Sequence, residues 1–196
     1  SEMCIRDRYC DAHHIPLIED AAQSQGAVYG KTPSGAMGDV SVFSFDPMKN
    51  MPSFGGGGMV LTDNNEIYDT VMSLRRHGTS GTHTYGYNSL ISEDHANQLL
   101  LLLSKFDRLQ NMREKVSKRY KKNIPEVQII CAGPKTKSSN HKLVILTDRR
   151  DELKAYLETK GIETKIHYAK TLDTKNLGLY PNSEKICARA LSLPIY

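Results

Sequence analysis

A lysine closes a strand-like apolar run in the stretch "VFSFDPMKN", residues 42–50, and four consecutive glycines follow it at 55–58. A lysine amine in a largely desolvated pocket has its charged form disfavoured, so Lys49 held in this way could form a Schiff base with an aldehyde. The alternative is a buried strand that leaves the core through a solvated turn. The glycines lack the GxGxxG spacing of a nucleotide-binding turn, so we expect them to let the backbone pass close to Lys49.

A carboxylate and an amide stand together in a second stretch, "LIEDAAQSQG", residues 17–26. Asp20 is expected at the carboxyl end of a strand, where open α/β sheets bind ligands, and Gln23 can face the same way. If the aldehyde is pyridoxal phosphate, Asp20 can keep its ring nitrogen protonated, so that the ring acts as an electron sink. Gln23 suits the ring hydroxyl and Ser44 suits the phosphate. Each residue alone is common in loops and caps, so the prediction depends on their combination with Lys49.

Three apolar runs are expected to form the strands that position these side chains. They are "IPLIED" (15–20), "GDVSVFSF" (38–45) and "GGMVLTD" (57–63). Their continuous rather than alternating apolarity predicts buried strands of a mostly parallel sheet covered on both faces. A helix over 64–78, ended by Gly78, completes this part of an α/β fold.

A long amphipathic helix is expected to connect this part to a second one. Apolar residues recur at helical spacing from Glu93 to Tyr120, and Pro125 ends the pattern. The sequence therefore predicts a large domain over 9–122, which includes the connecting helix, and a smaller α+β domain over 123–196. The elements expected in the smaller domain are strands at 141–147 and 163–168 and helices at 150–161 and 183–191.

The composition is typical of a globular protein, with 39% hydrophobic residues among 196 and a net charge of +4. Its four cysteines form no CxxC pair, which favours a reducing compartment, and we expect a cytoplasmic protein. No apolar run reaches the ~20 residues that a membrane helix needs. The basic run at 113–122 continues a helical pattern, so nucleic-acid binding is not expected. His13 and His14 have no ligand spacing with the other histidines, and we expect no metal site.

Both ends of the chain are expected to be truncated. Residues 1–8, "SEMCIRDR", have no clear periodicity and resemble the translation of a transposon adaptor used in sequencing, so we expect this segment to be non-native. The last run, "LSLPIY" (191–196), reads as a strand with nothing after it. We therefore expect a fragment that is inactive by itself.

Several motifs in one order resemble the DegT/StrS group of nucleotide-sugar aminotransferases, which are fold-type I pyridoxal-phosphate enzymes. The resemblance runs from about residue 15 to residue 196. Its motifs are EDAAQ, GD-x-x-x-FSF-x-x-x-K, GGMVLT, RRHG, GYNS, the long helix, GIETKIHY and LSLPIY. It implies a partial large domain with a mixed, mostly parallel sheet, followed by a partial small α+β domain.

The resemblance also implies roles for individual residues. Lys49 would be the Schiff-base lysine, and Asp20 the partner of the pyridine nitrogen. Asn88 would reach the phosphate in the neighbouring subunit of a homodimer. The remaining implied contacts are Gln23 at the ring hydroxyl, Ser44 at the phosphate, and His167 and Tyr168 on the substrate side. His77 could also lie near the site, but a histidine placed favourably against a helix dipole is an equal reading.

The implied reaction is transfer of an amino group, with glutamate as the expected donor, to a keto sugar attached to a nucleoside diphosphate. One alternative is a sugar dehydratase of the same group, but those enzymes replace the Schiff-base lysine with histidine. Another is a regulatory protein that binds the cofactor without turnover. Leu90 stands where relatives commonly have arginine, and the N-terminal third of the family is absent. The sugar, its carbon and the nucleotide stay open.

Overall fold

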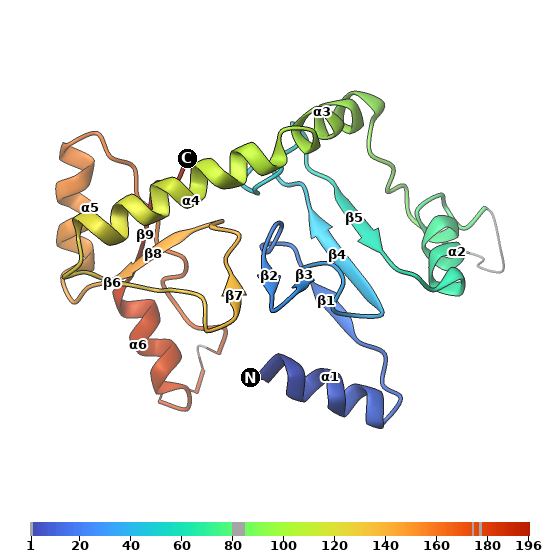
Figure 1. Ribbon diagram of the computed structural model, residues 1–196, viewed down its shortest axis with the longest axis horizontal. Helices are drawn as coiled ribbons and strands as arrows, with labels where there is room; N and C mark the ends of the chain where they lie inside the picture. Colours follow the sequence, from blue (N-terminus) through green and yellow to red (C-terminus); the bar gives the residue numbers. More distant parts are fainter. Residues whose placement is uncertain (1, 80–84, 174, 177) are drawn as a thin grey trace. The chain divides into compact units, whose positions relative to one another are not determined.

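The computed structural model describes residues 2–79, 85–173, 175–176 and 178–196 (Figure 1). The chain divides into two compact units. The first unit comprises Ser1–Asp107 and Pro134–Ser139, and the second comprises Arg108–Gly133 and Asn140–Tyr196. None of the helices in the described part is long and apolar enough to cross a membrane.

The first unit contains a three-stranded sheet in the order β1-β4-β5. β1 (Ile18–Asp20) is parallel to β4 (Val40–Ser44), and β4 is antiparallel to β5 (Gly58–Leu61). The sheet is therefore mixed, with one parallel and one antiparallel pair of strands. In the parallel pair, Asp20 lies beside Val42. The three strands confirm the predicted runs, although each is shorter than its run.

The prediction that all three strands are buried is wrong for the two outer strands. β5 is exposed along its whole length, with Val60 40% and Leu61 39% exposed, and Ile18 of β1 is 68% exposed. Only β4 carries a fully buried residue, Ser41. The reason is that β4 has a neighbour on both sides, whereas β1 and β5 each have one neighbour in this sheet.

A second small sheet, in the order β3-β2-β7, was not predicted from the sequence. β2 (Val28–Tyr29) and β3 (Thr32–Pro33) form a hairpin, and β2 also pairs with β7 (Thr136–Lys137). Strands of two residues carry no measurable periodicity, which explains the omission. This pairing brings a segment from far along the chain back to the first unit.

The described part of the first unit includes the helices α1, α2 and α3. α1 (Glu2–Ala12) includes most of the segment expected to be non-native, whose residue 1 lies outside the described residues. In α2 (Asn65–Leu74) the Asn64 side chain accepts hydrogen bonds from two backbone N–H groups of the first turn. α2 ends before the predicted Gly78, which instead donates its N–H to the Ser73 carbonyl.

The predicted single helix from Glu93 to Tyr120 is two helices in the structure. α3 (Glu93–Leu103) is followed by its C-cap Ser104, and α4 (Phe106–Asn123) begins two residues after that cap. The Ser104 hydroxyl donates to the Leu101 carbonyl at 2.8 Å. Such a bond offers the backbone an alternative to the helical ladder, and no proline or glycine marks the break.

The second unit contains the antiparallel sheet β6-β8-β9. Its strands are β6 (Gln128–Ile129), β8 (Leu143–Leu146) and β9 (Ala190–Leu193), with helices α5 (Arg150–Thr159) and α6 (Pro181–Arg189). β8 and α5 confirm the predicted strand and helix. The core of this unit consists of Leu143, Ile145, Leu191 and Ile195, with Val116 and Tyr120 of α4 packed against it.

One prediction for the second unit is wrong. The segment 163–168 is not a strand, since it makes only an isolated bridge between Lys165 and Ser192. The last predicted helix is present as α6 but ends at Arg189, and β9 confirms the strand-like reading of the run that begins at Leu191, whose side chain lies in the core. The boundary between the compact units also differs from the predicted domain boundary between residues 122 and 123. Most of α4 belongs to the second unit, and residues 134–139 belong to the first.

Candidate functional site

The carboxyl ends of β1 and β4 lie side by side in the first unit. The Ala21 N–H donates to the Val42 carbonyl at 2.9 Å, which continues the parallel pairing just beyond Asp20. Neighbouring strands lie about 4.8 Å apart, so Asp20 and the end of β4 at Ser44 form one edge of the sheet. Asp20 is exposed at this edge, and its Oδ1 accepts from the Ala22 N–H.

The carboxylate just before Asp20 has a different task, which sequence reasoning missed. Glu19 accepts hydrogen bonds from the N–H groups of Gly35 and Met37 and from the hydroxyls of Ser34 and Ser41, each at 3.0 Å. Burial raises the pKa of Glu19, but these hydrogen bonds outweigh it and hold the pKa below its ordinary value. Because successive side chains of a strand face opposite sides, fixing Glu19 also fixes the side on which Asp20 emerges.

Lys49 lies on the loop that follows β4, residues 45–54, which we call the lysine loop. The Phe45 N–H donates to the Gly57 carbonyl, and the Ser53 N–H donates to the Phe45 carbonyl, both at 2.8 Å. These bonds close the loop at its base. Within the loop, the Lys49 N–H donates to the Asp46 carbonyl at 2.9 Å and forms a turn. Lys49 is half-buried.

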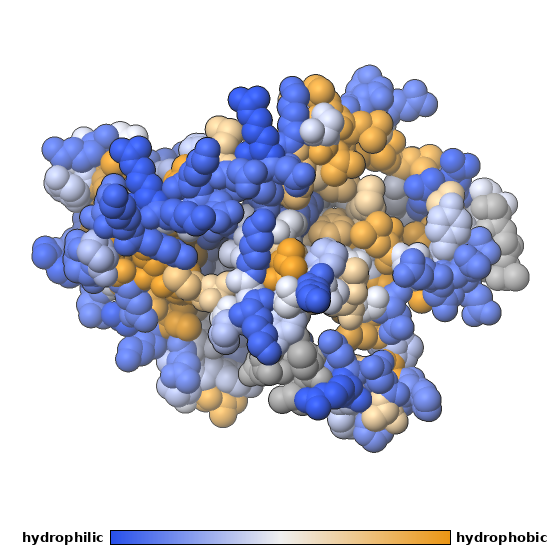
Figure 2. Space-filling view, viewed as in Figure 1, coloured by the Kyte–Doolittle hydropathy of each residue, from blue (hydrophilic) through white to orange (hydrophobic). Residues whose placement is uncertain are grey.

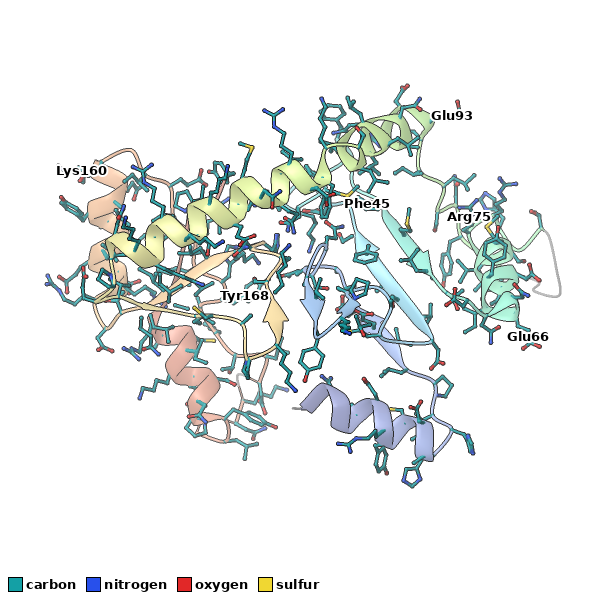
Figure 3. All side chains as sticks on the ribbon, in the orientation of Figure 1. Phe45, Glu66, Arg75, Glu93, Lys160 and Tyr168 are labelled. Carbon is teal, nitrogen blue, oxygen red and sulfur yellow. The ribbon has the colours of Figure 1, made fainter. Side chains whose placement is uncertain are left out.

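Two apolar side chains anchor the lysine loop, one on each side of Lys49. Phe45 and Met51 are buried and pack with Leu99 of α3 in the second core cluster of the chain. Figure 3 shows Phe45 at the end of β4 that is nearest to α3. The residues between the anchors that precede Lys49 are exposed, so the loop holds the lysine between two fixed points.

Each glycine at 55–58 has a close neighbour or a backbone conformation that other residues rarely adopt. A Cβ on Gly55 would lie 2.5 Å from Cε1 of His95, and Gly57 has φ +139°, which other residues rarely adopt. The prediction from sequence was a close approach to Lys49. The neighbours that the structure shows at these glycines are His95, Ile91, the Phe43 carbonyl oxygen and Phe45, the first residue of the lysine loop.

Two polar residues predicted for the site lie near the same sheet edge. The Ser44 hydroxyl, at the end of β4, accepts from the Asp46 N–H at 3.3 Å. Gln23 follows β1 with an exposed side chain, and its carbonyl accepts from the Ser139 hydroxyl at 3.2 Å. Gln25, two residues later, is buried and was not predicted, although its amide donates to the Ser44 carbonyl at 2.7 Å.

Asn88 is placed after α2, not at the edge formed by β1 and β4. It forms an isolated bridge with Arg76, and the Ser89 N–H donates to the Arg75 carbonyl at 3.1 Å. Its side chain is exposed. His77, in the same segment, has φ +61°, and its N–H donates to the Tyr87 carbonyl, so a turn rather than a regular helix end holds this histidine.

His167 and Tyr168 belong to the second unit. His167 Nδ1 lies 2.8 Å from the hydroxyl of the buried Ser192. Burial, and then the charges of Lys142 and Lys165, hold the pKa of His167 below its ordinary value. The Lys142 ammonium lies 5.6 Å from the ring centroid of Tyr168, whose exposed ring is labelled in Figure 3.

The donor set at the edge of the β1-β4 sheet fits pyridoxal phosphate by its chemistry. It offers an amine at Lys49, a carboxylate at Asp20, a hydroxyl at Ser44 and an amide at Gln23, and the carboxylate and amide are exposed. These are the groups that an aldehyde, a pyridine nitrogen, a phosphate and a phenolic hydroxyl require. Within the described ranges, no three histidine, cysteine, aspartate or glutamate side chains gather as a metal site would need.

Comparison with known proteins gives consistent matches. Residues 1–196 match the DegT/DnrJ/EryC1/StrS aminotransferase family. The chain is 32% identical to a pleiotropic regulatory protein of Geobacillus stearothermophilus, covering 94% of this chain and 54% of the relative. It is also 32% identical to dTDP-3-amino-3,4,6-trideoxy-alpha-D-glucose transaminase of Streptomyces venezuelae, covering 94% and 52%. The chain thus spans about half the length of these curated relatives.

Solved structures agree with the sequence matches. A DegT DnrJ EryC1 StrS aminotransferase from Brucella abortus has a TM-score of 0.87 and 31% identity, covering 96% of this chain and 54% of that one. S. venezuelae DesV in complex with a ketimine intermediate has a TM-score of 0.91 and 31% identity, covering 100% and 56%. These matches confirm the predicted fold-type I class of pyridoxal-phosphate-dependent aminotransferases. The chain belongs to the DegT/DnrJ/EryC1/StrS aminotransferase family.

Proposed function

We propose that the enzyme containing this chain is a pyridoxal-phosphate-dependent aminotransferase that transfers the amino group of glutamate to a keto sugar linked to a nucleoside diphosphate. One observation carries the proposal: the lysine loop holds Lys49 between two buried anchors at the sheet edge that also presents Asp20. The names of relatives support the substrate class, since they include transaminases of dTDP- and UDP-linked sugars.

Lys49 has two tasks in this proposal. Its Nζ would hold the cofactor through the aldehyde carbon, with loss of water, and once the donor amine has taken its place the free Nζ would move a proton from the donor α-carbon to the former aldehyde carbon. The cofactor, when bound, would supply an electron sink for the donor α-carbon. The Asp20 carboxylate would favour the protonated form of the ring nitrogen by charge pairing.

The other residues of the proposal bind rather than react. The Ser44 hydroxyl bonds the phosphate, and the Gln23 amide bonds the ring hydroxyl. Asn88 reaches the phosphate of the neighbouring subunit in a homodimer, which its exposed side chain permits. His167 and Tyr168 contact the substrate from the small C-terminal domain. The remaining feature of the proposal is a cytoplasmic location.

The test is transfer of nitrogen from ¹⁵N-labelled glutamate. The enzyme that contains this chain is incubated with pyridoxal phosphate and a panel of dTDP- and UDP-linked keto sugars, and the products are analysed by mass spectrometry. We expect label in an amino sugar nucleotide, and a loss of several powers of ten in Lys49→Ala, since both the covalent anchor and the proton carrier are removed. An unchanged rate in Lys49→Ala would contradict the proposal.

A regulatory protein that binds the cofactor without turnover is the second candidate, because one relative is named a pleiotropic regulatory protein. The same experiment separates the two functions. A regulatory protein binds pyridoxal phosphate saturably and gives no labelled sugar with any substrate of the panel. A sugar dehydratase is disfavoured by Lys49, and it would release water from the sugar without incorporating nitrogen.

A further inference from the structure

A buried amide ties the two sides of the lysine loop together. Gln25 Nε2 donates to the Ser44 carbonyl at 2.7 Å, and its Oε1 accepts from the Met51 N–H at 3.1 Å. Gln25 is 6% exposed, so water cannot readily replace either bond. One side chain therefore joins the last residue of β4 to the residue two positions after Lys49.

A second glutamine repeats this pattern on the following residues. Gln98 of α3 donates from Nε2 to the Pro52 carbonyl at 3.3 Å and accepts at Oε1 from the Phe54 N–H at 3.1 Å. Each glutamine thus satisfies one backbone acceptor and one backbone donor of the loop or its base. A shorter amide or a carboxylate could not bridge both groups with the same geometry.

The residue next to Lys49 is tied as well. Asn50 is 5% exposed, and its Nδ2 donates to the Ser139 carbonyl at 2.9 Å. The Ser139 hydroxyl in turn donates to the Gln23 carbonyl. The side chain beside the lysine is therefore bonded to the segment that carries β7, which is itself bonded to the segment after β1.

These contacts bear on reactivity because an amine must be oriented as well as present. Asp46, Pro47 and Met48 are exposed, so apolar packing does not fix the part of the loop that precedes Lys49. The fixed points are the two anchors and the polar bonds of the glutamines. Loss of those bonds would let the backbone of Lys49 sample other positions, and a displacement of about 1 Å can cost a reaction about 100-fold.

We propose that Gln25 and Gln98 are positioning residues that hold the lysine loop so that the amine of Lys49 meets the aldehyde at the edge of the β1-β4 sheet. This inference rests on the proposed function, because it assumes that Lys49 is the reacting amine. Both glutamines act on the backbone of the loop and its base, through the four hydrogen bonds given above.

The experiment compares Gln25→Leu and Gln98→Leu with Gln128→Leu, a control at an exposed position of β6 in the second unit. Each variant of the enzyme that contains this chain is treated with pyridoxal phosphate and reduced with borohydride at timed intervals, and the labelled lysines are mapped by mass spectrometry. Hydrogen exchange of the amides at 45–54 is measured in parallel, and urea unfolding identifies folded samples.

We expect labelling of Lys49 to slow about ten-fold or more in both loop variants, with faster exchange at 45–54 and unchanged labelling of other lysines. A merely structural role would speed exchange throughout the first unit and leave the share of label on Lys49 unchanged. Normal labelling of Lys49 and normal loop exchange in folded variants would overturn the inference. If Gln25→Leu does not fold, the labelling and exchange of Gln98→Leu decide, because Gln98 is only half-buried. Absence of label on Lys49 in the wild type would instead overturn the proposed function. Hydrogen exchange at 45–54 would then be the test of whether the two glutamines hold the lysine loop.

Discussion

Replacement of Glu19 by alanine should destabilise the first unit by about 3 kcal/mol. The carboxylate serves two backbone donors, the N–H groups of Gly35 and Met37, and the hydroxyls of Ser34 and Ser41. The hydroxyls can rotate to other acceptors, whereas the N–H groups cannot. A donor left unsatisfied costs about 1–3 kcal/mol, and the half-buried site takes the lower half of that range for each N–H because water reaches part of it.

The pH dependence of the same contact follows from the lowered pKa of Glu19. A carboxyl whose pKa is lower in the folded than in the unfolded state stabilises the fold above its unfolded pKa. This contribution is lost as the pH falls through the folded pKa. Glu19→Gln keeps the shape and removes the charge, so its unfolding free energy should lack this contribution. The difference between wild type and Glu19→Gln should therefore shrink towards acid pH.

Urea unfolding at neutral and acid pH, followed by circular dichroism, measures both effects. Glu66→Gln is the matched control, because Glu66 is an exposed carboxylate in the first turn of α2 and should change stability by less than about 0.5 kcal/mol. A Glu19→Ala protein as stable as that control would refute the reasoning. So would a gap between wild type and Glu19→Gln that widens as the pH falls.

Three further predictions concern other parts of the chain. Asp20→Asn should leave pyridoxal phosphate bound but lower the transamination rate at equal occupancy, since the ring nitrogen loses its charged partner; an unchanged rate would make Asp20 structural. Gly58→Ala should lower the urea midpoint, because its Cβ would lie 2.9 Å from the backbone carbonyl oxygen of Phe43. Ile145→Ala should cost about 2–5 kcal/mol in calorimetric or urea unfolding, because Ile145 is buried in the core of the second unit; a cost below about 1 kcal/mol would contradict this packing.

The strands and most helices could be predicted because their sequences carry local signals. Continuous apolar runs marked β1, β4 and β8, and an apolar stripe marked α5. The break at Ser104 could not be predicted, because the apolar spacing continues through it and no glycine or proline interrupts it. The hairpin of β2 and β3 was missed because two residues are too few for a period.

The sequence indicates the proposed reactive residues of the candidate site but not the residues that support them. Lys49, Asp20 and Ser44 follow apolar runs, and the ends of such runs are where ligands bind. Gln25 has its partners 19 and 26 residues away, and no local pattern signals such contacts. Glu19 was read as the neighbour of Asp20, but its partners come from a turn that only the fold brings near.

The exposed apolar side chains of α3 show that burial could not be predicted from the sequence of one helix alone. Leu100, Leu101 and Leu103 of α3 are exposed, and Figure 2 shows hydrophobic atoms gathered over this helix. The sequence pattern of α3 is nearly all apolar in this stretch, so it could not say which side faces the core. In the structure Leu99 is the buried residue, and it packs on the anchors of the lysine loop.

Mapping the site of covalent attachment tests the central claim most directly. The enzyme that contains this chain is mixed with pyridoxal phosphate, reduced with borohydride and digested, and the labelled peptide is identified by mass spectrometry. The account predicts label on the peptide that contains Lys49, its loss in Lys49→Arg because a guanidinium forms no Schiff base, and its persistence in Lys31→Arg, a control in the exposed β2–β3 turn. Label that is distributed over other lysines and unchanged in Lys49→Arg would contradict the account.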